Sequence, residues 1–184
     1  MKYFLLIFIL FSCSGVKQTQ TIDAKYLILN EYLKDKKGTS LIKENYFNGS
    51  TLRYFGMYEK WHKAFLQDKN NFSNIFFSKN QEWIFSKEDL KYMRANYTEW
   101  KVGSSWSKSK IKADVNLIDS KPNKYGMSPN IRVGYPFFDE TKTKAMVVVS
   151  KTNSPLNSAV HMLLFKKDKT GKWEQVGKLF VSIS

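Results

Sequence analysis

Cysteine and histidine are nearly absent from this chain. Its 184 residues include one cysteine, Cys13, and two histidines, His62 and His161. A single thiol cannot close a disulfide within the chain, and a zinc site needs three or four ligands, mostly cysteine and histidine. The sequence therefore predicts no disulfide and no metal centre, and we assign it no cofactor. We expect His161, which has apolar neighbours, to pack in the core or on a sheet face, and His62 to lie on a helix surface.

Arginine is scarce although basic residues are abundant. The chain carries 30 Lys and Arg against 16 Asp and Glu, a formal net charge of +14, yet its only arginines are Arg53, Arg94 and Arg132. Bidentate recognition of phosphates and bases depends on arginine, so we expect no nucleic-acid partner. Attraction to a phosphate-rich lipid surface is one alternative, and a solvated basic surface without a specific role is the simpler interpretation.

Familiar catalytic motifs are also missing. The sequence contains no Gly-x-Ser-x-Gly elbow and no glycine-rich phosphate loop. Two acidic pairs occur, Glu88-Asp89 and Asp139-Glu140. Adjacent residues of a helix do not face each other, and acidic residues in a first turn stabilise the helix N-terminus. We therefore interpret the first pair as a helix cap and the second as part of a turn, and we assign no catalytic residue.

Long apolar segments are absent, and one short run stands at the start of the chain. Tyr3 to Phe11 is not interrupted by a charged residue and follows Met1-Lys2. A helix that spans a bilayer needs about 20 apolar residues, so this run is too short to do so. A positive start, a short apolar segment and small residues after it are typical of an export signal.

The end of that run, Leu10-Phe11-Ser12-Cys13, resembles the lipobox of bacterial lipoproteins: an aliphatic residue, a variable one, a small one and then cysteine. The resemblance implies cleavage before Cys13, a diacylglycerol on its thiol and an acylated amine. The alternative is an ordinary secretory signal whose cysteine is discarded. We expect residues 1–12 to be a signal peptide, 13–21 a lipidated flexible tether and 22–184 a single globular domain.

Three helices are predicted in the first half of the chain. Asp23 is the expected N-cap of a helix that continues to about Lys36. Residues 59–69 form a second candidate helix. Ser86 and Asp89 have the spacing of a capping box, which is the clearest helix start in the sequence.

The aromatic segments between these helices are predicted to form hairpins. Asn48-Gly49 is a hairpin-type turn between two aromatic runs. Residues 73–77 and 82–85 form a second candidate hairpin. Residues 120–130 contain proline, glycine and asparagine, and we expect a long loop there.

The last third of the chain alternates short apolar segments with turn residues. Strands are predicted over 145–150, 159–167 and 172–184, with a connection over 151–158 and a tight turn over 168–171. Such closely spaced strands pair in antiparallel fashion. Helices followed by an antiparallel sheet predict an α+β fold.

Three motifs between residue 86 and residue 173 carry a further resemblance. They are Ser-Lys-Glu-Asp-Leu-x-Tyr-Met at 86–93, Pro-Phe-Phe-Asp-Glu with an alanine five residues later at 136–145, and Lys-x-Gly-Lys-Trp at 169–173. The pattern resembles a group of small uncharacterised lipoproteins from Bacteroidetes-type bacteria, which implies no particular activity. The order of helices and curved sheet is also similar to the cystatin and nuclear-transport-factor-2 cone folds, an analogy of shape alone.

Four aromatic residues gather in the middle of the chain: Trp83, Tyr97, Trp100 and Trp106. On a cell-surface protein such rings could stack on sugars, whereas in a chain rich in Phe and Tyr most aromatic residues form the core. We keep both interpretations and take these four residues as a candidate ligand platform.

Two functions remain open. The first is a non-catalytic lipoprotein, exported and anchored through Cys13 to the cell envelope, on the periplasmic or surface side of the outer membrane, that binds a protein partner or an envelope component. The alternative is a small-molecule or glycan-binding module, with weak hydrolase activity at most, on the concave face of the sheet. A deep pocket with converging polar and aromatic groups would favour the alternative, and a filled core with an exposed apolar patch would favour the first.

Overall fold

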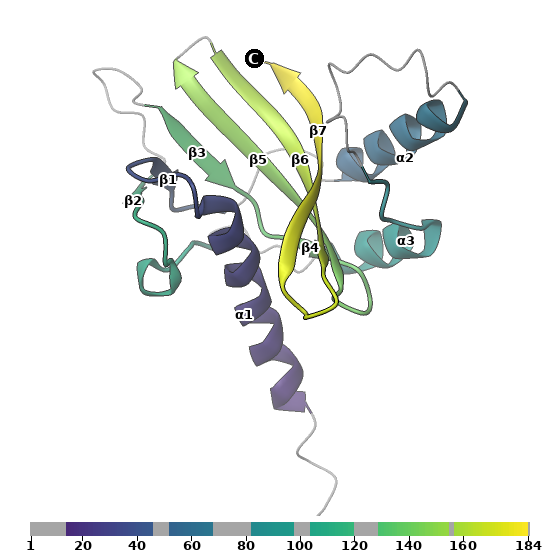
Figure 1. Cartoon of the computed structure of the whole chain (residues 1–184), viewed down its shortest axis with the longest axis horizontal. Coiled ribbons are helices and arrows are strands. Elements are labelled where there is room, and N and C mark those ends of the chain that lie inside the picture. Colours follow the sequence, from purple (N-terminus) through teal and green to yellow (C-terminus); the bar gives the residue numbers. More distant parts are fainter. Residues whose placement is uncertain are drawn as a thin grey trace, which may run out of the picture.

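The computed structural model describes residues 14–45, 52–67, 82–97, 104–119, 129–154 and 157–183. These segments form an α+β fold, as predicted, in which helices lie on both sides of one mixed sheet (Figure 1). The elements are α1 (Ser14–Leu33), β1 (Ser40–Ile42), α2 (Leu52–Gln67), α3 (Lys87–Asn96), the 3₁₀ turn η2 (Lys108–Lys110), β2 (Asn116–Ile118), β3 (Asn130–Val133), β4 (Phe137–Phe138), β5 (Lys144–Ser154), β6 (Asn157–Lys167) and β7 (Trp173–Ile183).

The sheet has seven strands in the order β2-β1-β3-β5-β6-β7, and β4 pairs with β5 beside β3. Strand β1 is parallel to both β2 and β3, so strands distant in sequence meet at this side of the sheet. Strands β5, β6 and β7 form the predicted antiparallel meander. Each of these three strands is 11 residues long, so they make up the main body of the sheet.

Alternation along β5 and β6 divides the core into two clusters, one on each face of the sheet, because successive side chains of a strand point to opposite faces. The first cluster lies under α1 and contains Tyr26, Ile28, Leu29, Leu33, Leu41, Trp106, Ile111, Val115, Ile131, Val133, Ala145, Val147, Val149, Leu163, Phe165 and Trp173. The second lies under α2 and α3 and contains Tyr54, Phe55, Tyr58, Phe85, Leu90, Met93, Phe137, Met146, Val148, Met162, Leu164 and Leu179. Helices therefore cover both faces of the sheet, so neither face is an open concavity along its whole length.

Helix α1 begins earlier than predicted. It starts at Ser14, so Asp23 lies inside the helix rather than at its N-cap, and residues 14–21 are helical rather than a flexible connection. The helix ends at Leu33, and Gly38 follows with φ of 71°, a left-handed conformation that favours glycine. Leu29 is 1 % exposed and lies on the buried face of the helix, whereas Leu27 is 52 % exposed.

Helix α2 replaces one arm of a predicted hairpin. It confirms the helix expected over 59–69, but it begins at Leu52, so the aromatic run that contains Tyr54 and Phe55 is helical rather than extended. These aromatic side chains bury against the sheet with Tyr58. Residues 48–49 lie outside the described part of the chain.

The second predicted hairpin is also wrong where the structure describes it. Residues 82–86 have no regular secondary structure. The backbone N–H of Glu82 donates to the carbonyl of Val176 on β7 at 3.3 Å. Residues 73–77 and 120–128 lie outside the described part of the chain.

Helix α3 begins as predicted. The backbone N–H of Asp89 donates to the Ser86 hydroxyl at 3.1 Å, and the Asp89 carboxylate accepts from the Ser86 N–H at 2.8 Å. This reciprocal pair is a capping box. Phe85, which precedes the cap, and Leu90 bury in the same cluster.

Two turns built on the same plan join β4 to β5 and β6 to β7. In each turn an aspartate carboxylate accepts the backbone N–H four residues later, Asp139 from Thr143 and Asp168 from Lys172. A threonine two residues after each aspartate donates its hydroxyl to that carboxylate. The fourth position of each turn has positive φ, at 55° for Lys142 and 83° for Gly171.

The predicted connection over 151–158 is mostly strand. Strand β5 continues to Ser154 and β6 begins at Asn157, with an irregular register between Thr152 and Ser154. The apolar pattern underestimates these strands because their outer ends carry polar residues. The pairing of Lys151 with Ala159 and of Thr152 with Ser158 extends the sheet beyond the residues that bury against helices.

Candidate functional site

The four aromatic residues of the predicted ligand platform are not brought together. Trp106 is 1 % exposed and lies in the cluster under α1. Trp83 and Tyr97 pack against the other cluster, on the opposite face of the sheet. Trp100 lies outside the described residues. Trp106 therefore offers no surface to a ligand, and a platform would have to consist of Trp83 and Tyr97 without it.

Trp83 is held in a cage of aromatic side chains from α2. The ring of His62 stacks on Trp83 with centroids 4.9 Å apart and planes 8° apart, and Tyr58 meets Trp83 edge-on at 5.3 Å. His62, predicted to lie on a helix surface, is half-buried on α2 with its ring against Trp83, and burial lowers its pKa. Burial also raises the pKa of Tyr58 to about 12, and its hydroxyl accepts the backbone N–H of Phe85 at 3.0 Å. These contacts pack α2 against the segment that precedes α3.

Trp106 links α1 to the sheet. Its Nε1–H donates to the carbonyl of Val133 at 3.0 Å, and its ring meets Tyr26 and Tyr135 edge-on. The ammonium of Lys25 lies 4.1 Å from the centre of the Tyr135 ring and donates to the Tyr135 hydroxyl at 2.9 Å. The aromatic group is thus occupied by a lysine of the same chain, and we interpret it as packing.

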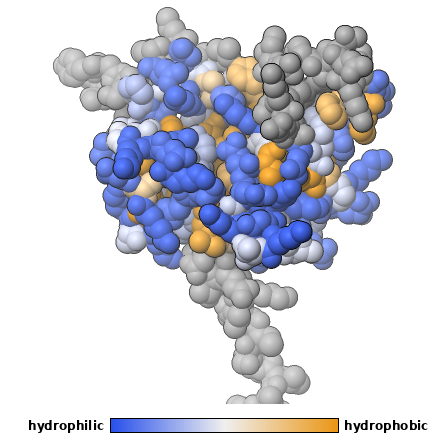
Figure 2. Space-filling model, in the orientation of Figure 1, coloured by the Kyte–Doolittle hydropathy of each residue, from blue (hydrophilic) through white to orange (hydrophobic). Residues whose placement is uncertain are grey.

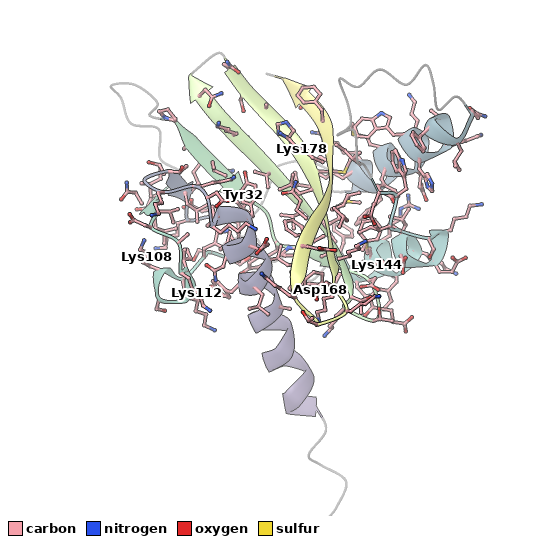
Figure 3. The ribbon with its side chains drawn as sticks, in the orientation of Figure 1. Tyr32, Lys108, Lys112, Lys144, Asp168 and Lys178 are labelled. Atoms are coloured by element: carbon pink, nitrogen blue, oxygen red, sulfur yellow. The ribbon has the colours of Figure 1, made fainter. Side chains whose placement is uncertain are left out.

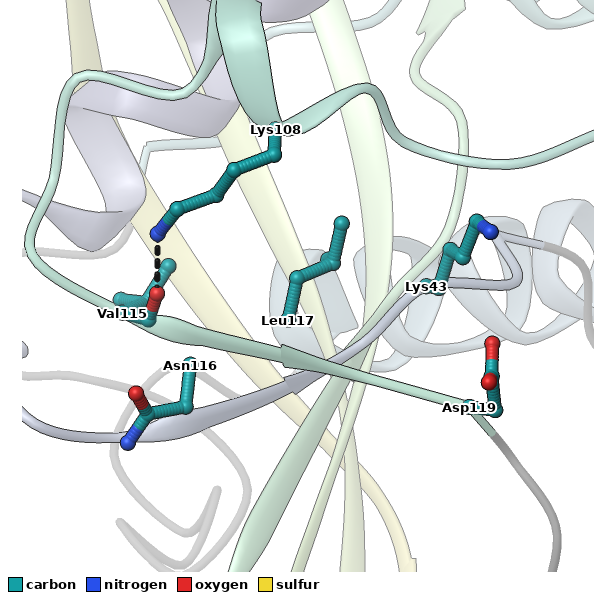
Figure 4. Close-up of a pocket in the computed structure, with 6 residues that line it drawn as sticks. All are labelled: Lys43, Lys108, Val115, Asn116, Leu117 and Asp119. Atoms are coloured by element: carbon teal, nitrogen blue, oxygen red, sulfur yellow. Dashed lines mark hydrogen bonds between the residues drawn. The ribbon is translucent and has the colours of Figure 1, made fainter.

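An open groove lies at the β2 edge of the sheet (Figure 4). Its volume is about 430 Å³, and its lining consists of Lys43, Lys108, Val115, Asn116, Leu117 and Asp119. The ammonium of Lys108 donates to the carbonyl of Val115, so one of the two groove lysines is engaged in holding the chain. The groove is wide and lacks aromatic residues, unlike the deep pocket that a small-molecule module would need.

His161 lies on the α1 side of the sheet, where β5, β6 and β7 extend beyond the helix. It pairs with Val149 on β5 and with Phe180 on β7, and its ring meets that of Phe180 edge-on at 5.5 Å. Burial, together with the charges of Lys178 and Lys151, lowers the pKa of His161 to about 4. The prediction of a face-packing histidine is confirmed, and two lysines are near it.

The acidic pairs have the roles predicted for them. Asp89 caps α3 and also binds the ammonium of Lys144 at 2.7 Å. Burial works against ionisation of Asp89, but hydrogen bonds from Lys144 and Ser86 outweigh it and lower its pKa. Asp139 is 2 % exposed, and its carboxylate accepts the N–H groups of Thr143 and Lys144. Both carboxylates are fully engaged in shaping the fold.

The described residues offer little apolar surface for a partner. The large hydrophobic side chains exposed among them are Leu27 at 52 % and Leu66 at 60 %, and these lie on α1 and α2, on opposite sides of the sheet. Figure 2 shows the α1 side as largely hydrophilic, with small separate hydrophobic patches.

Within the described part of the chain, no three metal-binding side chains come together, and no helix has the length and hydropathy needed to cross a bilayer. Comparisons of the chain with protein families, with curated proteins and with solved structures find no match.

Proposed function

We propose that this protein is a non-catalytic lipoprotein of the cell envelope that binds a partner or an envelope component. Residues 1–12 direct its export, and Cys13 carries the lipid that holds it at the membrane. The observation that carries the proposal is the Leu10–Cys13 motif placed directly after an apolar run and directly before the first helix.

The geometry of α1 suits such an anchor. The helix begins at Ser14, one residue after Cys13, and its second half buries Tyr26, Ile28 and Leu33 in the core. A helix of 20 residues is about 30 Å long. Figure 1 shows its N-terminal part extending beyond the body of the domain. The helix would thus act as a stalk that joins the lipid to the sheet.

Binding rather than catalysis is favoured by how the polar groups are used. The carboxylates of Asp89 and Asp139 hold a helix cap and a turn, and the ring of His62 is stacked on Trp83. The groove at β2 is open and has no aromatic wall. These arrangements favour the envelope-binding function over a small-molecule module.

Mass spectrometry of the membrane-extracted protein tests the anchor. The mature chain should begin at Cys13 and carry the mass of a diacylglycerol and an amide-linked acyl group. A Cys13→Ala variant should lose membrane association, while Ser14→Ala, altered one residue outside the motif, should keep it. A soluble, unlipidated wild-type protein would exclude the anchor and favour free secretion.

A further inference from the structure

The outer part of the sheet brings basic residues from three strands to one face. Lys151 on β5 is opposite Ala159, and Lys178 on β7 is opposite Leu163, so the two lysines are placed diagonally on either side of His161 on β6. Because successive side chains of a strand point to opposite faces, Lys151, His161 and Lys178 lie on the face of the sheet that α1 covers over part of its length. Lys151 and Lys178 are both exposed, and Lys178 lies on the part of β7 beyond the end of the helix (Figure 3).

A third lysine reaches this face from the chain after α1. Burial lowers the pKa of Lys36, and the charges of Lys151 and Lys178 lower it further, against the opposing effect of its neighbour Asp35. The same two lysines act on His161. The Lys36 ammonium lies over the ring of Tyr32, and Figure 3 shows Tyr32 at the end of α1 next to the part of β7 that carries Lys178. We define the basic face as Tyr32, Lys36, Lys151, His161, Lys178 and Phe180.

Aromatic rings lie among these charges. The ammonium of Lys36 is 4.5 Å from the centre of the Tyr32 ring, which holds the lysine over the end of α1. Tyr32 lies near the C-terminal end of α1 in Figure 3, and Lys178 lies on the part of β7 beyond it. Phe180 is half-buried and stands edge-on to His161. The face therefore combines positive charge with flat apolar surfaces, the two features that recognise an acidic sugar chain.

We propose that the basic face binds an acidic envelope polysaccharide, with its lysines on carboxylate or phosphate groups and its rings against the sugars. The proposal rests on the envelope function proposed above and names the chemistry of its partner. Lys151 and Lys178 are two strands apart, about 10 Å across the sheet, and four residues of β6 separate their partners Ala159 and Leu163, about 13 Å along it, so their backbones are about 16 Å apart. That separation suits charges repeated along a polymer better than one small ion.

Lysine rather than arginine fits this partner. An ammonium on a flexible stem acts as a mobile point charge and can follow irregularly spaced anions, whereas a guanidinium requires a fixed planar geometry. The position of the face also separates it from the lipid: Lys36 follows the C-terminal end of α1, and Cys13 precedes its N-terminal end. The helix alone places about 30 Å between these two points, so a polymer beyond the anchoring lipids can reach the face.

The test is a calorimetric titration of the full-length protein in detergent with polygalacturonate, and with neutral dextran as the uncharged sugar. A Lys151→Gln/Lys178→Gln variant removes two charges from the basic face. Its matched control is Lys63→Gln/Lys87→Gln, which removes two exposed lysines from α2 and α3 on the other side of the sheet. We expect the first variant to bind polygalacturonate about tenfold more weakly, and the control to stay within about twofold of wild type.

A Phe180→Leu variant separates sugar recognition from charge. It should weaken binding to polygalacturonate and leave binding to polyglutamate, a polyanion without sugars, unchanged. Equal losses in the two double variants, absence of wild-type binding to polygalacturonate, or equally tight binding to polyglutamate would each overturn the proposal. So would lysine-dependent binding to vesicles of anionic lipid without binding to the polysaccharide.

The lipid-anchor proposal and the basic-face proposal can fail independently, and one variant distinguishes the two failures. The Cys13→Ala protein should bind polygalacturonate as the wild type does, because the basic face lies at the other end of α1. A wild-type protein that carries no lipid but still binds polygalacturonate would leave the basic face intact and refute the anchor alone. Thermal unfolding of all variants shows that each is folded before its affinity is compared.

Discussion

The ammonium of Lys144, at the start of β5, lies 2.7 Å from the carboxylate of Asp89 in the first turn of α3. The same carboxylate accepts the backbone N–H of Ser86. One side chain therefore closes the capping box and joins the helix to β5, the first strand of the meander. The acid pair that sequence analysis assigned to a cap thus also fixes where α3 lies on the sheet.

The cap of α3 should contribute measurably to stability. Replacing Ser86 with alanine removes the acceptor for the Asp89 N–H, and we expect the free energy of unfolding to fall by about 1 kcal/mol. Ser107 is the matched control, because it precedes the 3₁₀ turn η2 without a side-chain capping bond. Ser107→Ala should change the free energy by less than about 0.5 kcal/mol. Urea unfolding of both variants measures the difference, and equal losses would contradict the role of the cap.

Two buried tryptophans of one cluster should respond differently to the loss of their indole N–H. Trp106 donates to the carbonyl of Val133, whereas Trp173 Nε1 has no hydrogen-bond partner within the described residues. Both variants to phenylalanine lose packing, but only Trp106→Phe loses a hydrogen bond, and Trp173→Phe removes an unpaired buried donor. We expect Trp106→Phe to be more destabilising by about 1–2 kcal/mol. Denaturant unfolding of the two variants measures this; a Trp173→Phe loss as large as that of Trp106→Phe would be inconsistent with it.

The paired aspartate turns allow opposite predictions at equivalent positions. Lys142 has a φ of 55°, which is costly for a residue with a side chain, so Lys142→Gly should raise the free energy of unfolding by about 0.5–1 kcal/mol. Gly171 has a φ of 83° and open space around its Cα. Gly171→Ala should therefore lower stability by about 1 kcal/mol through backbone strain alone. Thermal melts of both variants would show the opposite shifts, and shifts of the same sign would refute the shared geometry.

His161 should make the protein sensitive to mild acid. Its pKa in the folded protein is about 4, below the ordinary value of 6.5. As the pH falls from 6.5 toward 4, the unfolded chain therefore binds a proton that the folded protein does not, and stability is lost across this range. With allowance for solvent screening, the loss amounts to about 1–2 kcal/mol.

His161→Leu should remove that pH dependence. We expect the wild-type free energy of unfolding to fall between pH 6.5 and pH 5, where few carboxylates titrate, and that of the variant to stay nearly level. His62→Gln is the control, because the pKa of His62 is lowered to a lesser extent by burial alone. Unfolding curves at several pH values measure the effect, and parallel curves for wild type and His161→Leu would disprove it.

The sequence predicts best where structure depends on neighbouring residues. The capping box of Ser86 and Asp89 and the turn at residues 168–171 are local patterns, and both are confirmed. The apolar segment over 159–167 predicts strand β6 almost to its ends. These features need no knowledge of distant parts of the chain.

Prediction fails where tertiary packing decides the outcome. The run with Tyr54 and Phe55 has aromatic residues typical of strands, yet it is helical because α2 buries those rings on the sheet. The parallel pairing of β1 with β2 joins residues 40–42 to 116–118, and no local pattern indicates it. Polar ends of β5 and β6 gave no apolar signal, so the strands were predicted too short.

The basic face could not be predicted from the sequence for a related reason. Lys36, Lys151 and Lys178 are widely separated in the chain, and only the register of three strands brings two of them beside His161. Register shifts in the pairing of β6 with β7 decide which side chains share a face. The only signal in the sequence was the excess of lysine over arginine, which indicates a kind of partner without placing it.

The continuity of α1 from Ser14 into the core limits how the domain can explore its surroundings. With the proposed lipid on Cys13, a flexible linker would let the domain move freely around the anchor, whereas a helix fixed at Tyr26, Ile28 and Leu29 would let it move only as one rigid body with the helix. The C-terminal end of the helix would stay at a nearly constant distance of about 30 Å from the anchor. The domain would therefore often contact molecules at this distance from the bilayer, and would contact molecules close to the bilayer only when the helix lies along the membrane surface.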